Sequence, residues 1–305
     1  MNTPMPINSM KTSDFSMSPE VFGVISGLIR SEAGISIAES KVAMVKSRLS
    51  GRLRRLKLSS FDEYVALVQS HEGADERERF ISALTTNVSH FFREPHHFET
   101  LRKTIAPVLL EKSKAGGRVR IWSSACSNGQ EPYSIAMALL DSTPEIANYD
   151  VKILATDIDP VVLKVAKQGI YEGPMLSGLD DATRDKYFHM TSTIGEKAFQ
   201  ASEQLRAMIT FRRLNLVSEW PMSGVFDIIF CRNVLIYFDE DTQQKVCRNF
   251  HKFLGPQGWL FLGHSERIPD EIANDFESLG VTAYNKKTLV SPFAQSGAIQ
   301  HGGGI

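Results

Sequence analysis

The chain has 305 residues, of which 42% are hydrophobic and 23% charged, so it holds enough apolar material for one or two folded domains. The formal net charge of -1 excludes a global field that favours nucleic acid or an acidic membrane surface. Its cysteines, Cys126, Cys231 and Cys247, are odd in number and widely spaced, which argues for a reducing compartment and against a disulfide framework or zinc site. Because no apolar run approaches the roughly 20 residues of a membrane span and the N-terminus lacks a signal-peptide core, we expect a cytoplasmic protein.

The first part of the chain has a helical pattern. Residues 1–17 lack periodicity and predict a disordered segment, whereas residues 18–92 predict a small all-helical domain. Ser18 is a candidate N-cap, Pro19 suits the first helical turn, and Gly34 is a candidate helix end.

One predicted helix of this domain is strongly basic. Residues 41–57, KVAMVKSRLSGRLRRLK, contain seven cations and no acid. A solvated face is the ordinary explanation for such a run. Docking of an acidic partner is the functional alternative.

After residues 93–117, which predict a linker with a helix, the pattern changes. Residues 118–288 alternate strands and helices, which predicts a doubly wound α/β domain with a mainly parallel sheet. Residues 170–208 break the alternation and predict an inserted subdomain of a helix and short antiparallel strands; residues 289–305 predict a disordered tail. The predicted strands are 118–125, 151–159, 209–216, 226–233 and, after a GPQG turn, 259–263, and the predicted helices are 131–140, 160–169 and 241–254.

The loop after the first strand discriminates between cofactors. A dinucleotide site requires several glycines and free amides at the helix start, whereas SACSNGQEPY (124–133) has one glycine, Gly129, followed by Glu131 and Pro132. Proline lacks the amide donor and glutamate repels phosphate, so a dehydrogenase is disfavoured. Glu131 suits a cationic ligand such as S-adenosylmethionine, or it is a favourable first-turn acid on the helix dipole.

Polar residues also follow the later strands, where doubly wound sheets bind ligands. Asp157 is placed to accept from ribose hydroxyls, and Asp159 before a proline indicates a helix cap. Asn215 is either a base-reading side chain or an ordinary turn residue. Arg232 and Asn233 interrupt an apolar run, and burial of such groups requires partners.

These segments resemble the chemotaxis receptor protein-glutamate O-methyltransferases, the CheR family, from about residue 20 to 287. The resemblance implies methyl transfer from S-adenosylmethionine to glutamates on the cytoplasmic helices of chemoreceptors, giving methyl esters and S-adenosylhomocysteine. It rests on LTTNVSHFFRE (84–94), IWSSACSNGQEPYSIAMAL (121–139), ATDID (155–159), LNL (214–216), FDIIFCRNVLIYF (226–238) and GHSE (263–266).

The resemblance also implies site residues. Glu131 would hold the methionine portion and Asp157 the ribose, while Asn215 and Leu216 would meet the adenine. Arg93 and Tyr237 are implied at the reacting centre, although each also has an ordinary structural explanation. The implied cofactor-binding set is Asn87, Ser89, Arg93, Glu131, Asp157, Asn215, Leu216, Arg232 and Asn233.

The chain departs from the family pattern at Gln130, at Ser89, and at ACSNG (125–129), where residues like ASTG are expected. Gln130 stands where a second glutamate is common, which makes the pocket less acidic, and Ser89 stands where threonine is frequent. No metal site is expected, because the adjacent His96 and His97 do not easily share a metal geometry.

For the partner, the resemblance implies the cytoplasmic helical domain of chemoreceptors, which the basic helix at 41–57 could dock. No nucleic acid and no membrane insertion are expected. Two alternatives to glutamate methylation remain, a non-catalytic S-adenosylmethionine-binding regulator and a methyltransferase with a different acceptor. Some family members carry a receptor-tail-binding insertion at the place of residues 170–208, but this segment has no decisive signature.

Overall fold

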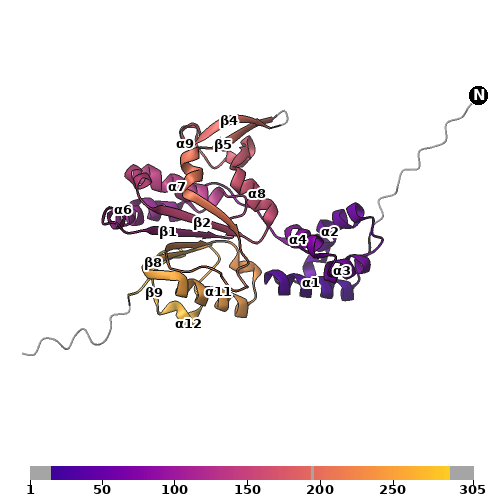
Figure 1. The fold of residues 1–305 in the computed structure, drawn as a ribbon. Coiled ribbons are helices and arrows are strands. Elements are labelled where there is room, and N and C mark those ends of the chain that lie inside the picture. Colours follow the sequence, from indigo (N-terminus) through magenta and orange to yellow (C-terminus); the bar gives the residue numbers. More distant parts are fainter. Residues whose placement is uncertain (1–14, 194–195, 289–305) are drawn as a thin grey trace, which may run out of the picture.

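The computed structural model describes residues 15–193 and 196–288 (Figure 1). The predicted disordered tail, 289–305, lies outside these residues, as does most of the segment 1–17. Phe15 is described and is 7% exposed, because its ring packs edge-on against Phe61. None of the helices in the described ranges is long and apolar enough to cross a membrane.

A helical domain forms the first part of the described chain and lies at one end of the central sheet (Figure 1). Its first helix has the predicted ends: the Ser18 hydroxyl accepts from the Val21 amide, and Gly34 has the left-handed φ of 74°. The apolar stripes of the helices meet in a separate core. The helices are α1 (Pro19–Ala33), the 3₁₀ helix η1 (Glu39–Lys41), α2 (Val42–Leu56), α3 (Phe61–Gln69) and α4 (Ala74–Leu84).

The second part is built on a seven-stranded sheet. The first five strands in spatial order are parallel, and β10 is antiparallel to β8 and β9. The order is β6 (Ile209–Arg213), β2 (Val151–Asp157), β1 (Val119–Ser124), β7 (Phe226–Cys231), β8 (Leu254–Leu262), β10 (Ala283–Lys286) and β9 (Phe276–Gly280). The doubly wound prediction is therefore confirmed, and β10, antiparallel to both neighbours, extends the sheet together with the edge strand β9.

Helices cover both faces of this sheet (Figure 1). In β7, Ile228 and Phe230 join the core under α7, whereas Ile229 and Cys231 join the core under α11, as expected for side chains that alternate across a strand. The helices on the α7 side are α5 (Pro95–Thr100), α6 (Ala106–Lys114), α7 (Gln130–Ser142), α8 (Pro160–Gln168) and α10 (Glu203–Met208), and those on the other side are α11 (Glu240–Phe253) and α12 (Asp270–Ala273).

The predicted linker, 93–117, is almost entirely helical. A π-helical segment, η2 (Leu101–Ile105), connects α5 to α6. Pro107 lies at the start of α6 and has no amide to continue the regular ladder, which accounts for the irregular turn before it. Short 3₁₀ helices occur at η3 (Pro144–Asn148) and η5 (Leu235–Tyr237).

The predicted antiparallel insertion is confirmed. A three-stranded sheet pairs β3 with β5 and β5 with β4, both antiparallel, and lies beside α8 and α9 (Figure 1). Tyr171 and Phe188 anchor it to the main core through edge-on contacts with Phe91. Its elements are β3 (Ile170–Glu172), η4 (Gly173–Leu176), α9 (Asp181–Tyr187), β4 (Phe188–Thr193) and β5 (Glu196–Ala201).

One predicted turn is wrong. The GPQG segment lies within β8, because Leu254 already pairs with Phe226 before the register shifts. Gln257 has a φ of 56°, so the extra residues form an irregularity in the strand and not a reversal of the chain.

A seam of hydrogen bonds joins the helical domain to the second part. Ile35 forms an antiparallel bridge with Phe238, and the Ser36 amide donates to the Tyr237 carbonyl at 2.8 Å. Gly34 allows this approach, since a Cβ there would meet the side chains of Val217 and Phe238. The helical domain is therefore held against the carboxyl ends of the parallel strands.

Candidate functional site

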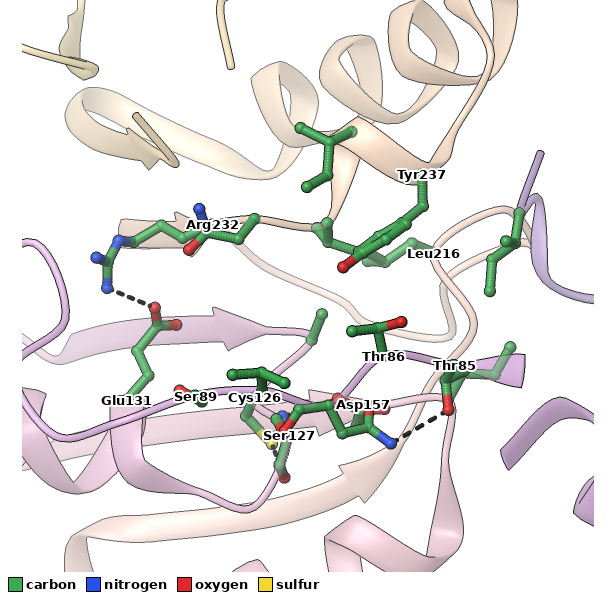
Figure 2. A pocket seen from close by; sticks show the side chains of 18 of the residues that line it. Thr85, Thr86, Ser89, Cys126, Ser127, Glu131, Asp157, Leu216, Arg232 and Tyr237 are labelled. Carbon is green, nitrogen blue, oxygen red and sulfur yellow. Dashed lines mark hydrogen bonds and ion pairs between the residues drawn. The ribbon is translucent and has the colours of Figure 1, made fainter. Parts of the chain in front are cut away.

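A pocket of about 180 Å³ lies beyond the carboxyl ends of β1, β2 and β7, beside the seam with the helical domain (Figure 2). All ten residues assigned to the site from the sequence line this one pocket. They are Asn87, Ser89, Arg93, Glu131, Asp157, Asn215, Leu216, Arg232, Asn233 and Tyr237. This position matches the rule that open α/β sheets bind ligands at the carboxyl ends of their strands.

Arg232 is held at the end of β7 by two carboxylates. Its side chain is only 2% exposed, and it forms ion pairs with Glu131 at 3.0 Å and with Glu94 at 3.2 Å. The guanidinium also donates to the Arg93 carbonyl. These partners compensate the buried charge of Arg232, although its Nε has no hydrogen-bond partner among the described residues.

The two carboxylates that share Arg232 titrate differently. Burial acts to raise the pKa of Glu94, but the Arg232 charge and hydrogen bonds from Asn233 and His264 outweigh it and lower that pKa to about 2. Burial raises the pKa of Glu131, and Arg232 with the Ser123 hydroxyl offsets this only in part. Glu94 is therefore the more acidic of the two carboxyl groups and stays ionised to a lower pH than Glu131.

Glu131 at the start of α7 has its charge matched within the protein. One oxygen accepts from the Ser123 hydroxyl at 2.7 Å. The other accepts from Arg232 at 3.0 Å (Figure 2). A cationic ligand at Glu131 would therefore meet an ion pair and not an isolated carboxylate. The helix-dipole interpretation is also compatible, because Glu131 lies in the first turn of α7.

Asp157 and Asp159 have separate positions. Asp157 lines the pocket and accepts from the amides of Ser127 and Asp159, at 2.8 and 2.9 Å. Its burial raises the pKa to about 6. Asp159 caps α8, as predicted, through the Val161 amide. The ribose assignment to Asp157 remains compatible with this geometry, because each carboxylate oxygen has a further acceptor site.

The two asparagines have structural partners as well as pocket positions. The Asn87 amide donates to Asp159 at 2.8 Å. The Asn215 amide donates to the Glu32 carbonyl at 2.7 Å, and its oxygen accepts from the Val217 amide. The turn interpretation of Asn215 is thus present in the structure, and the residue nevertheless lines the pocket.

Arg93 and Tyr237 approach the pocket from different segments. The Arg93 guanidinium donates to the Val88 carbonyl at 3.0 Å, which fixes it against the chain after α4. Tyr237 ends η5, and its hydroxyl points into the cavity above Thr86 (Figure 2). A cation and a phenol therefore share a cavity with the Asp157 carboxylate.

Sequence reasoning missed part of the lining. Ala33 and Ile35 from the helical domain reach the pocket, as do His90 and Ile236. The signal for Ile35 was weak, because only the long-range bridge to Phe238 brings it there. Burial lowers the pKa of His90, so this imidazole favours its neutral form.

His96 and His97, which were not expected to share a metal geometry easily, lie close together beside Glu94. Ligand atoms of Glu94, His96 and His97 lie within 4.8 Å of one another. The Arg232 guanidinium, however, lies 3.2 Å from a Glu94 oxygen and would repel a divalent cation. His97 Nε2 lies 3.1 Å from the Val281 carbonyl, and burial lowers the pKa of His97 to about 3, so the ring is neutral at physiological pH.

Comparison with known proteins shows similarity over most of the chain. Residues 87–285 match the family model "CheR methyltransferase, SAM binding domain", and residues 20–85 match "CheR methyltransferase, all-alpha domain". A probable chemotaxis protein methyltransferase of Rhizobium etli is 48% identical over 261 residues, which cover 86% of this chain and 97% of the relative. Chemotaxis protein methyltransferases of Klebsiella aerogenes and Escherichia coli are 42% and 40% identical, and the alignments cover 88% and 90% of this chain and 90% and 93% of the relatives.

Proposed function

Because the chain belongs to the CheR methyltransferase family and is a chemotaxis methyltransferase that uses S-adenosylmethionine, we propose that it esterifies glutamate side chains on the cytoplasmic helices of chemoreceptors. The observation that carries the proposal is that segments distant in sequence bring a cation, a phenol and two carboxylates into one pocket. We further propose a cytoplasmic location, where these receptor helices lie.

The donor set of the pocket fits the cofactor. The carboxylates of Glu131 and Asp157 line it and suit a ligand with an ammonium and a sulfonium. Two guanidinium groups line it as well, and that of Arg232 is already paired with Glu94 and Glu131. When bound, S-adenosylmethionine supplies a methyl group on a positively charged sulfur. We assign Glu131 to the methionine portion, Asp157 to the ribose, and Asn215 with Leu216 to the adenine.

The remaining assignments concern the walls of the cofactor site. Asn87, Ser89, Arg232 and Asn233 line the pocket beside the groups assigned above. Arg232 acts there by holding Glu131 and Glu94 in place. In the free protein Gln130 is buried, so its replacement of a family glutamate removes a potential charge from behind the pocket.

A glutamate acceptor requires no general base. Its carboxyl has a pKa of about 4.3 in model peptides, so the acceptor is already ionised near neutral pH. The task of the protein is then alignment of the carboxylate with the methyl group. We assign Arg93 and Tyr237 to this alignment, because a cation and a hydroxyl both bind a carboxylate oxygen.

Receptor docking is assigned to α2. Arg54 and Arg55 are exposed, and neither forms an ion pair within the part of the chain that the structure describes. Two other cations of this helix have structural roles, since Arg52 pairs with Glu76 and Arg48 donates to the carbonyls of Leu84 and Thr85. The exposed pair complements an acidic helical surface.

The test is a methyl-transfer assay with labelled S-adenosylmethionine and cytoplasmic receptor fragments. We expect label on the fragment that alkali releases as volatile methanol, because methyl esters are base-labile. A matched fragment with acceptor glutamates replaced by glutamine should remain unlabelled. Alkali-stable label would indicate another acceptor group, and cofactor binding without transfer to any receptor fragment would favour a non-catalytic regulator.

A further inference from the structure

A buried carboxylate behind the pocket collects four backbone amides. Glu266 is 4% exposed and lies in the loop after β8. Its Oε2 accepts from the amides of Gly263 and Asn233, at 2.5 and 2.9 Å. Its Oε1 accepts from the amides of Val234 and Ile236, at 2.8 and 3.4 Å. Such a cluster of amides is an anion-binding nest, and here the anion is a side chain.

Three of these amides belong to the segment that carries the site. Asn233, Val234 and Ile236 line the pocket, and Tyr237 follows directly. Asn233 has a φ of 59°, an unusual backbone conformation for a residue other than glycine. Its side-chain amide donates at 3.2 Å to Glu94, which also pairs with Arg232. Glu266 thus binds the backbone of the segment while other groups bind its side chains.

Gly263 makes this arrangement possible. A Cβ at this position would lie 2.7 Å from both the Asn233 amide nitrogen and a Glu266 oxygen. Any larger residue would therefore separate the carboxylate from the segment that it holds. Gly263 and Glu266, both in the GHSE stretch, therefore serve the same contact, which joins the Glu266 carboxylate to the backbone amides of residues 233–236.

We propose that Glu266 is a positioning residue, whose ionised carboxylate holds residues 233–237 so that Asn233 and Tyr237 face the cofactor and the acceptor. Glu266 does not line the pocket, so it acts through the backbone and not on the ligand. An ionised carboxylate is required because it only accepts hydrogen bonds, whereas an amide would direct an N–H at backbone donors. The inference rests on the proposed function, which assigns Tyr237 to the acceptor.

The test compares Glu266→Gln with Asp227→Asn. Asp227 lies at the other end of β7, where it accepts from the Arg120 amide at 2.9 Å and from Lys112 at 2.5 Å. Both substitutions are isosteric, and both replace a carboxylate that accepts from backbone amides. Amide hydrogen exchange, cofactor affinity by calorimetry, and kcat per folded molecule are measured for each on the full chain, well below the unfolding temperature.

For Glu266→Gln we expect exchange at Asn233, Val234 and Ile236 to accelerate about tenfold or more, and kcat to fall by about ten- to a hundredfold, as for small misplacements of reacting groups. Asp227→Asn should leave both quantities at the wild-type value. Glu266→Asp, which keeps the charge on a shorter side chain, should recover part of the protection and part of kcat.

Unchanged exchange at these amides, or a wild-type kcat per folded Glu266→Gln molecule, would overturn the proposal. If Glu266→Gln does not fold, the same measurements on Glu266→Asp decide. The shorter aspartate side chain would not reach the Ile236 amide, so this amide should still exchange faster than in the wild type. Exchange and calorimetry need no acceptor. They therefore test Glu266 even if the wild-type protein methylates no glutamate, which would be a failure of the proposed function alone.

Discussion

Two regions of the molecule carry arginines in opposite circumstances. At the pocket, the Arg232 side chain is 2% exposed and pairs with two carboxylates. On α2, Arg54 and Arg55 are exposed and have no ion-pair partner in the described part of the chain. A charge that is buried and doubly paired stabilises one arrangement, whereas an exposed charge attracts over a distance set by the salt concentration.

Arginines in these two settings should affect different properties of the protein. The pocket arginine should influence folding and the placement of neighbouring groups. The α2 pair should influence encounter with an acidic partner. The position of an arginine, and not its helix, determines which effect it has. Arg52 also lies on α2, but it is paired with the buried Glu76, so we expect it to influence folding as Arg232 does.

The largest expected effect is that of Arg232→Ala. Removal of one partner from a buried pair leaves uncompensated charge, so the free energy of unfolding should fall by about 3–5 kcal/mol. Denaturant unfolding measures this change. Arg213→Ala is the control, because its pair with Glu78 is about half exposed and should contribute only about 0–1 kcal/mol. If the free energy of unfolding fell equally in Arg232→Ala and Arg213→Ala, burial of the ion pair would not determine its contribution to stability.

Tyr237→Phe and Arg93→Ala come next. Each should lower kcat about ten- to a hundredfold through poorer alignment, with an unfolding midpoint near that of the wild type. Tyr149→Phe, at a tyrosine that is 37% exposed and lines a different cavity, serves as the control. Wild-type rates of methyl ester formation in both site variants would refute their assignment to the reacting centre.

A smaller effect is expected from Arg54→Glu combined with Arg55→Glu. The Michaelis constant for the receptor should rise about tenfold at low salt and less at high salt, while kcat stays constant. Lys103→Glu combined with Arg118→Glu changes the net charge equally at exposed positions outside α2. If this control raises the constant as much, total charge and not the α2 surface controls docking.

The last expected effect, of similar size, concerns the pH dependence of cofactor binding. Burial raises the pKa of Asp157 to about 6, so its carboxylate is ionised above pH 6 and loses acceptor capacity as the pH falls through that value. Cofactor affinity should therefore fall about tenfold between pH 7.5 and pH 5, because each pH unit below the pKa of one group changes affinity by at most tenfold. Calorimetry across this range provides the measurement.

Two variants identify the residue whose titration causes the pH dependence of cofactor affinity. Asp157→Asn should bind weakly with little pH dependence, whereas His90→Gln should retain the dependence, since burial already lowers the pKa of His90. An unaltered pH profile in Asp157→Asn would assign the titration to another pocket group.

Local patterns in the sequence predicted much of this molecule. The ends of α1, the cap of α8 and the parallel strands β1, β2 and β7 follow from residue spacing and capping chemistry, and the structure confirms them. The set of pocket residues came from the family resemblance. The bond of Asn215 to Glu32 and the four amides at Glu266 depend on residues distant in sequence, which no local pattern reports.

The last two strands of the sheet, β9 and β10, were missed for a similar reason. After one buried residue β9 is exposed and β10 is half-buried, so neither alternates between buried and exposed positions, and β10 is specified mainly by pairing with β8. The GPQG segment resembles a turn in composition, but the pairing of Leu254 with Phe226 keeps it in the strand. Tertiary pairing thus overrode local preference at both places.

The seam between Ile35 and Phe238 has a consequence for recombination between relatives. Because the helical domain contributes Ile35 to the ligand pocket and Ser36 to the backbone beside Tyr237, residues 18–92 are not an exchangeable module. A chimera that imports this domain from another homologue would also replace residues that line the pocket. If α2 docks the receptor as proposed, a change of receptor preference by domain exchange would therefore also change the pocket.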